Sequence, residues 1–465
     1  MKKNRGFNLK KNKHEVGSLS LWKLSWPLFF QLLLVYGVLL TDSYFLSRLS
    51  DYHAGAVGAV FPAFCVCYMI FNQLGQAGCS VASQYMGAKK FESVTPTYIA
   101  AVFVLLICGV SLSAAMFYFS DNIASLVGLA NQEKDVAILY TKVVGSALFL
   151  EALKGAYNGI LSSRAKTMWS LGIGVVYILF NLVANIAFFV FLPELGVIGV
   201  GISTVLAQIM SFVLCLYAVH WKEKIAFNFK STDQSLFAIA RKILWIGIPA
   251  SLEPISVQFM SIIVTQMIVG FGMDAMTAKT YAFNLVSLVI AWSVSIGVGT
   301  LILVAHSVGA RDFENANRQM HRSMFINSVV STFVVAFLWF FSDQIFSNFT
   351  TNASILNIAK ALLAVSIFCE PLRAMNIVMA YALSSAGDSR FNAVAGPVIM
   401  WVIGLPLCYF IGVKLGFGVL GIWVGLSLDE LLRGIVYYSR WRMRKWETTG
   451  VVTRETLLEV ESLRI

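Results

Sequence analysis

Long apolar segments recur along almost the whole 465-residue chain, from Trp22 to near the C-terminus. Each holds roughly 20 residues or more, enough for a helix to span about 30 Å of hydrocarbon. The chain is 58% hydrophobic and only 13% charged, whereas a soluble domain carries about a quarter charged residues. Only helices and closed barrels satisfy their backbone in lipid, and barrel strands are short and alternating. The runs therefore predict an all-α polytopic membrane protein.

Basic residues set the orientation of twelve predicted spans. They gather in the N-terminus, in the even-numbered loops and in the tail, and they are sparse on the other side. By the positive-inside rule, both termini are expected in the cytoplasm of a multi-pass protein, and we expect a bacterial inner membrane. The predicted spans are 22–46, 55–82, 94–119, 136–161, 168–192, 197–220, 241–270, 276–306, 323–342, 357–384, 391–413 and 417–439.

The two halves of the chain repeat each other at a constant offset of 222 residues. Gly87-Ala88 recurs as Gly309-Ala310, and Pro27 recurs as Pro249. Six spans per half is an even number, so the halves enter the membrane the same way and form two parallel six-helix repeats. The repeated Gly-Ala is expected to allow a tight exit from spans 2 and 8 and to do no chemistry. The expected division is a basic N-terminus (1–20), an N-lobe (21–220), an inter-lobe loop (221–240), a C-lobe (241–440) and a tail (441–465).

Four segments of this frame resemble the multidrug and toxic compound extrusion (MATE) family, over about residues 20–446. They are Pro27 followed by T-D-S-Y-F-L-S-R-L-S-D, the G-A-[KR]-x-F-E type of signature after spans 2 and 8, L-S-S-A-G-D-S-R at 383–390, and G-I-W-V-G-L-S-L-D-E-L-L-R-G in span 12. The resemblance implies MATE-like lobes and a secondary antiporter, not an enzyme. It would export organic, often cationic compounds, drugs or toxic metabolites in exchange for H⁺ or Na⁺ by alternating access, without a cofactor.

One polar cluster is expected inside the N-lobe. Asp42 falls in the outer half of span 1, with no basic residue one turn away. Asn181 and Asn185 share one face of span 5, and Thr204 of span 6 reaches a similar depth, about 18 to 20 Å from the cytoplasmic edge. These groups could coordinate Na⁺ through oxygen atoms, or let Asp42 carry a proton, because burial disfavours its charged form. In the MATE family the matching positions form the cation site of this lobe, so the resemblance assigns that role to these four residues.

The C-lobe lacks this cluster, since Ile403 and Leu407 stand where the asparagines would be. Some MATE proteins have functional acids in spans 7 and 10, about one turn further on than the acids of this chain. The candidate substrate or proton groups are Glu253, Glu370, Tyr36 and Tyr281. Two pairs three residues apart can each neutralise themselves as structural or gating pairs, namely Glu151 with Lys154 and Glu370 with Arg373. Asp429, Glu430 and Arg433 are expected near the cytoplasmic end of span 12, in a structural role.

Two other classes of function stay open. A lipid-linked saccharide flippase of a related fold would show several unpaired basic residues, whereas most intramembrane bases here have an acid one turn away. A membrane-embedded enzyme or receptor would show a metal or nucleophile cluster or a large ligand-binding domain. No metal site is expected beyond Na⁺ at Asp42, Asn181 and Asn185, and Gly87 and Gly309 lack the spacing of an ATP-binding loop. The expected partners are a small organic molecule, H⁺ or Na⁺ and the bilayer, with no nucleic acid, and we expect a monomer.

Overall fold

The computed structural model describes residues 20–49, 51–227, 235–347 and 350–451, which are helical almost throughout. Helix is the expected state of these apolar segments because it pairs every backbone group within one segment. Nearly all of the predicted N-terminus, residues 228–234 of the inter-lobe loop and residues 452–465 of the tail lie outside the described residues.

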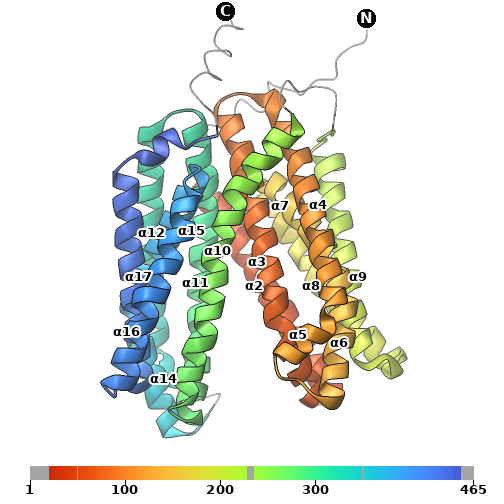
Figure 1. Cartoon of the computed structure of the whole chain (residues 1–465), viewed down its shortest axis with the longest axis vertical. Coiled ribbons are helices and arrows are strands. Elements are labelled where there is room, and N and C mark those ends of the chain that lie inside the picture. Colours follow the sequence, from red (N-terminus) through yellow and green to blue (C-terminus); the bar gives the residue numbers. More distant parts are fainter. Residues whose placement is uncertain (1–19, 50, 228–234, 348–349, 452–465) are drawn as a thin grey trace, which may run out of the picture.

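Helices up to residue 222 form a first group (Figure 1). They are α2 (Leu21–Leu49), α3 (Asp51–Gly87), α4 (Val94–Tyr118), α5 (Ser120–Leu126), α6 (Asn131–Ser146), α7 (Leu148–Ser163), α8 (Thr167–Phe191) and α9 (Gly196–Leu216), which continues as the π-helical η4 (Tyr217–Lys222). The short 3₁₀ turns η2 (Phe91–Ser93) and η3 (Pro193–Leu195) precede α4 and α9.

Helices from residue 236 onward form the second group. They are α10 (Leu236–Val269), α11 (Met273–Gly309), α12 (Phe313–Phe340), α13 (Ser342–Phe346), α14 (Ala353–Ser385), α15 (Ser389–Ile399), α16 (Leu405–Tyr409) and α17 (Gly418–Arg442). The π-helical segments η5 (Met400–Gly404) and η6 (Phe410–Lys414) join α15 and α16 into one span, and the 3₁₀ helix η7 (Lys445–Thr448) follows α17.

Nine helices of the described residues are long and apolar enough to cross a membrane. The fourth predicted span is broken, because α6 and α7 meet at Ala147 with a bend of 40°. Together they make a tenth span, and α2 and α17 bring the number to the predicted twelve. Apolarity alone could not locate the break at Ala147, since the predicted span 136–161 runs across it without a Pro.

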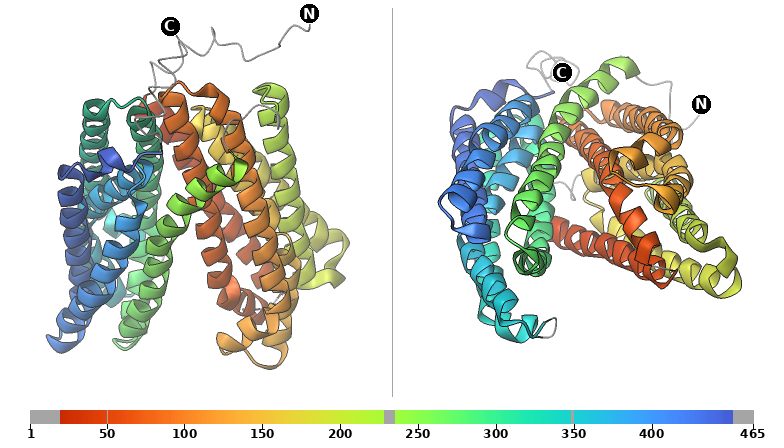
Figure 2. Two further views of the ribbon diagram at one scale, coloured as in Figure 1. Left: turned by 45° about the horizontal axis from the view of Figure 1, so that its top comes forward. Right: turned by 60° about the horizontal axis from the view of Figure 1, so that its bottom comes forward.

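The two groups lie close together at one end and diverge toward the other (Figures 1 and 2). At the close end α3 finishes at Gly87 and α11 at Gly309, so we call this side the signature face. Among the described residues, one apolar cluster joins the groups there, with Leu24 and Cys79 packed against Ile296 and Leu303.

Helix α10 belongs partly to each group. Ile239, Ile243 and Ile246 from its first half are fully or almost fully buried in the core of the first group, beside Val94 and Tyr98. Further along, Met260, Val264 and Ile268 lie in the core of the second group. The sequence-based division at residue 241 therefore cuts a helix that the structure shares between the two cores.

The repeated glycines have a different role from the one expected. The left-handed backbone that turns the chain belongs to Lys89 (φ 60°) and Arg311 (φ 56°), not to Gly87 or Gly309. Instead, a Cβ on Gly87 would overlap the carbonyl oxygen of His306, and a Cβ on Gly309 would overlap that of Gln84. The signature glycines are therefore needed because α3 and α11 approach each other backbone to backbone.

Candidate functional site

Asp42 is held by three neutral hydrogen-bond donors from two other helices. Asn181 Nδ2 and Asn185 Nδ2 of α8 donate to its Oδ1 at 3.1 and 2.8 Å, and Thr204 Oγ1 of α9 donates to its Oδ2 at 2.9 Å. Asn181 and Asn185 face α2 together because they lie one helical turn apart. The structure therefore brings together all four residues of the predicted cluster, toward the side of the bilayer opposite the signature face.

The cluster is buried, and no basic side chain of the described part of the chain pairs with its charge. Asp42 is 7% exposed, Asn181 0%, Asn185 2% and Thr204 5%. Within the described residues Asp42 forms no ion pair, and its partners are amides and a hydroxyl. An ionised carboxylate in such surroundings is costly unless a proton or a metal ion joins it.

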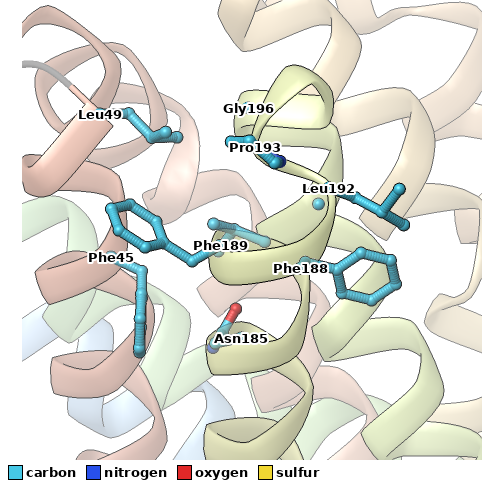
Figure 3. Close-up of a pocket in the computed structure, with 10 residues that line it drawn as sticks. Phe45, Leu49, Asn185, Phe188, Phe189, Leu192, Pro193 and Gly196 are labelled. Carbon is cyan, nitrogen blue, oxygen red and sulfur yellow. The ribbon is translucent and has the colours of Figure 1, made fainter.

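A small pocket reaches this cluster. Its volume is about 10 Å³, which is the size of about one water molecule, and it lies between the ends of α2, α8 and α9. Figure 3 shows Asn185 below Phe189, with its side-chain oxygen toward the pocket. That oxygen, Asn185 Oδ1, is buried and has no hydrogen-bond partner among the residues that the structure describes.

The donor set suits a hard cation. Carboxylate, amide and hydroxyl oxygens are the ligands that small oxygen-preferring ions take. Asn185 Oδ1 is such an oxygen beside Asp42, and no described residue hydrogen-bonds to it. A proton on Asp42 would equally neutralise the site, and Thr204 and the asparagines can re-form hydrogen bonds to a neutral acid. The geometry thus fits Na⁺ or H⁺. In the described residues, no group of three or more His, Cys, Asp and Glu residues is placed to hold another metal.

A second polar cluster lies in the second group, and sequence reasoning found only parts of it. Arg433 of α17 contacts three acids, with its Nη1 3.1 Å from Glu253 Oε1 and its Nη2 2.8 Å from Asp429 Oδ2 and 3.0 Å from Glu430 Oε1. Glu253 comes from α10, 180 residues earlier in the chain, so no local spacing could reveal this partner.

Arg373 extends the same network to α14. Its Nη1 lies 2.6 Å from Glu370 Oε1, and its Nε lies 3.0 Å from Glu430 Oε1. Asn376, one turn further on, donates to Glu430 Oε2 at 2.8 Å. We call these residues the C-lobe network: Glu253, Glu370, Arg373, Asn376, Asp429, Glu430 and Arg433. Its four carboxyl groups face two guanidinium groups.

The depth of this network differs from the prediction for span 12. Asp429 is the twelfth residue of the 25-residue helix α17, so it lies at the middle of the span and not near its end. The end of the helix, with Arg440, Trp441 and Arg442, occupies the interfacial position instead.

The remaining sequence candidates have simpler surroundings. Lys154 Nζ lies 2.6 Å from Glu151 Oε2, and it also sits over the ring of Tyr177 at 4.7 Å. Tyr281 of α11 is half-buried against the core of the second group, away from the Asp42 cluster. The side chain of Tyr36 lies outside the described residues.

Two bundles of membrane-spanning helices that join at one end, with polar clusters held in the bilayer, define a multi-pass membrane transporter. The chain belongs to the MATE family, because the family model described as MatE matches residues 27–187 and 249–410. The two matched segments begin 222 residues apart, which is the offset of the internal repeat. Members of the family are transporters and not enzymes, and they need no cofactor.

Relatives and solved structures agree with this assignment. The chain is 29% identical over 438 residues to the "Uncharacterized transporter YisQ" of Bacillus subtilis, covering 93% of this chain and 96% of the relative. It is 25% identical to the "Probable multidrug resistance protein NorM" of Bacillus licheniformis, covering 74% and 78%. A crystal structure of MATE in the bent conformation superposes with a TM-score of 0.85 at 20% identity, covering 93% and 96%. The predicted all-α, twelve-span fold of two repeats is confirmed.

Proposed function

We propose that this protein is a secondary antiporter that exports organic, often cationic compounds in exchange for H⁺ or Na⁺. One observation carries the proposal: Asp42 is buried among neutral donors, so its charge awaits a cation from outside the protein. Asn181, Asn185 and Thr204 complete the cation-coupling site. An ion that binds one arrangement of the lobes more tightly than the other shifts the lobes toward that arrangement.

The orientation follows from the charges. The signature face carries the basic loops, including Lys89 and Arg311, and therefore faces the cytoplasm of a bacterial inner membrane. The pocket at Asn185 opens toward the other side, from which an inward gradient of H⁺ or Na⁺ delivers the ion. The lobes are residues 21–220 and 241–440, acting as a monomer, with α10 shared between their cores.

Glu253 and Glu370 are the candidate substrate or proton groups of the C-lobe. Each is paired with an arginine, Glu253 with Arg433 and Glu370 with Arg373, so an arriving proton or cationic substrate would compete with a guanidinium. Tyr281, and Tyr36 outside the described side chains, are candidates for lining the substrate path. The ion pairs of both arginines argue against a flippase, which would need unpaired basic residues to hold phosphate.

The relatives point to the substrate class. Several curated relatives carry the name "Probable multidrug resistance protein NorM", and structures of similar fold include a multidrug resistance MATE family transporter in an outward-facing conformation. The proposed substrates are therefore drugs and toxic metabolites, often organic cations.

The test is transport in proteoliposomes with the cationic dye ethidium as the probe, under independently imposed proton and sodium gradients. We expect one gradient to drive export by the wild-type protein and Asp42→Asn to reduce it to the level of protein-free liposomes. Asp274→Asn makes the same change at an exposed carboxylate of α11 and should transport normally. Undiminished gradient-driven export by Asp42→Asn would reject the assigned role.

A further inference from the structure

The side-chain amide of Gln84 connects three separate parts of the chain at the signature face. Gln84 is fully buried near the end of α3. Its Nε2 donates to the carbonyl oxygen of Ser385, the last residue of α14, at 2.6 Å. Its Oε1 accepts from the backbone N–H of Val451 at 2.7 Å. The amide nitrogen of this N-lobe side chain is thus bound by the C-lobe, and its oxygen is bound by the segment that follows the C-lobe in the chain.

The second of these contacts comes from a segment beyond the last span. We call residues 443–451 the strap. It leaves α17 through Arg444, whose backbone is left-handed at φ 53°, and continues as η7. Trp446 anchors it to the C-lobe: the indole is 1% exposed, stacks on Trp441 at 4.2 Å and donates from Nε1 to the Trp441 carbonyl oxygen at 2.9 Å.

From this anchor the strap crosses to the other lobe. Thr449 Oγ1 donates to the carbonyl oxygen of Ala386 at 3.0 Å, just after α14 ends. Gly387, at φ +94°, makes room for the strap, since a Cβ there would overlap the Thr449 carbonyl oxygen. Val451 then packs against the N-lobe core cluster that contains Val81 and Tyr85.

We call the close approach of α3 and α11 at Gly87 and Gly309 the seam. The strap contacts the N-lobe beside this seam, where the lobes must separate. Gln84 is also the residue whose carbonyl oxygen faces Gly309 across the close approach of α3 and α11. When the signature face opens, Gln84 moves away from Ser385, and the strap, fixed at Trp446, must release Val451. Bonds that exist in only one of two states shift the balance toward that state.

We propose that the strap is a latch that holds the signature face closed and thereby favours the state open to the opposite side. The inference rests on the lobe rocking of the proposed antiporter, but it assigns a task to a segment outside the twelve spans. One hydrogen bond of ordinary strength shifts a two-state equilibrium about fivefold, and loss of the Val451 side-chain contact should add to this.

The test measures the distance between the lobes at the signature face. Spin labels on Lys224→Cys, beside Ile225 of the first group's core, and on Arg318→Cys in the C-lobe occupy exposed positions. The full-length protein has its seven native cysteines replaced by alanine. Double electron–electron resonance then gives the closed and open populations in nanodiscs. Val451→Pro removes the donated N–H and also loses the valine side chain. Val451→Ala shortens the side chain but keeps the N–H, so it is the matched control.

Two chain lengths provide an independent comparison. A chain ending at Thr449 lacks the contact to Gln84, whereas a chain ending at Thr453 keeps it. We expect Val451→Pro to raise the ratio of open to closed protein about fivefold over Val451→Ala, and the shorter chain to exceed the longer one by at least as much. Gly87→Leu, which wedges the seam directly, provides the fully opened reference.

The outcomes separate the latch from the transport mechanism. Unchanged distances in Val451→Pro and in the shorter chain, with a longer distance in Gly87→Leu, would overturn the latch and leave the antiporter proposal standing. Unchanged distances in all three would overturn both, because lobes that cannot separate at this face have nothing to latch. Longer distances in both strap variants support the latch.

Discussion

The two lobes share a fold but treat buried charge in opposite ways. In the N-lobe a single acid, Asp42, is surrounded by amides and a hydroxyl. In the C-lobe four acids are threaded between Arg373 and Arg433. The first arrangement leaves a charge for a visiting ion to neutralise, whereas the second supplies two cations for its four acids. A duplicated scaffold can therefore keep its packing while one copy becomes an ion site and the other a cross-linked polar core.

This difference predicts that removing a buried charge lowers stability much more in the C-lobe than in the N-lobe. Arg433→Met should lower the free energy of unfolding by about 3–5 kcal/mol, because it leaves Glu253 and Asp429 without a cation. Asp42→Asn should change it by about 1 kcal/mol or less. Thermal unfolding of the purified proteins in one detergent measures both. The triple variant Arg433→Met with Glu253→Gln and Asp429→Asn should recover much of the loss. Equal losses in the two lobes would erase the contrast.

Where the lobes are alike, equivalent changes should have equal effects. Gly87→Ala and Gly309→Ala each push a methyl group into the backbone of the other lobe, and each should destabilise the closed seam by about 1–3 kcal/mol. The spin-label distance at the signature face and thermal unfolding measure the effect. Gly172→Ala is the control, since this helical glycine has open space around it. If only one of the two glycines were sensitive, the seam would not be symmetric.

The Asn185 amide should matter for the ion and its C-lobe counterpart should not. Asn185→Ala removes a hydrogen bond to a charged group and an unused oxygen, a loss of about 1.5 kcal/mol, so the half-saturating concentration of the coupling ion should rise about tenfold. Leu407→Ala changes the position 222 residues later. Transport rates over a titration of the driving ion compare the two. A shift in Leu407→Ala as large as that in Asn185→Ala would contradict the assignment.

The smallest expected effect is the difference in stability cost between breaking the Glu151–Lys154 pair and breaking the Glu370–Arg373 pair. Lys154 pairs with a single acid, whose side chain is 22% exposed, and with one ring. Lys154→Met should therefore cost about 1 kcal/mol. Arg373→Met should cost more, because Arg373 bridges Glu370 and Glu430. The free energy of unfolding of the two variants, measured over a series of denaturant concentrations, tells them apart. Indistinguishable costs would mean that the C-lobe network adds nothing to an ordinary helical pair.

Hydropathy and charge predicted the spans because lipid imposes length and composition on every helix separately. The Asp42 cluster was also within reach, since the depth of each residue in a span follows from counting along a helix of fixed rise. The contact between Glu253 and Arg433 was not, because it depends on how α10 packs beside α17. Asp429 was placed too near the cytoplasm, although the same counting along the predicted span 417–439 puts it near the middle of the helix.

Local sequence also could not reveal what the repeated glycines touch. When only its sequence neighbours are considered, a glycine at the end of an apolar run predicts a turn. The structure assigns the turn to Lys89 and Arg311 and uses Gly87 and Gly309 for a contact across the repeat. In the sequence, a glycine required by such a contact looks the same as a glycine required by a turn.

The mutual fit of Gly87 and Gly309 has a consequence for how this chain can change over generations. Each glycine packs directly against the backbone of the other half. Because backbone and not side-chain atoms fill the space, side chains of the other half cannot adjust to a larger residue. The two halves are free to drift apart in their polar clusters, but at this point they inherit one shared restriction. The repeated Gly-Ala therefore marks a contact between the halves that neither half can change alone.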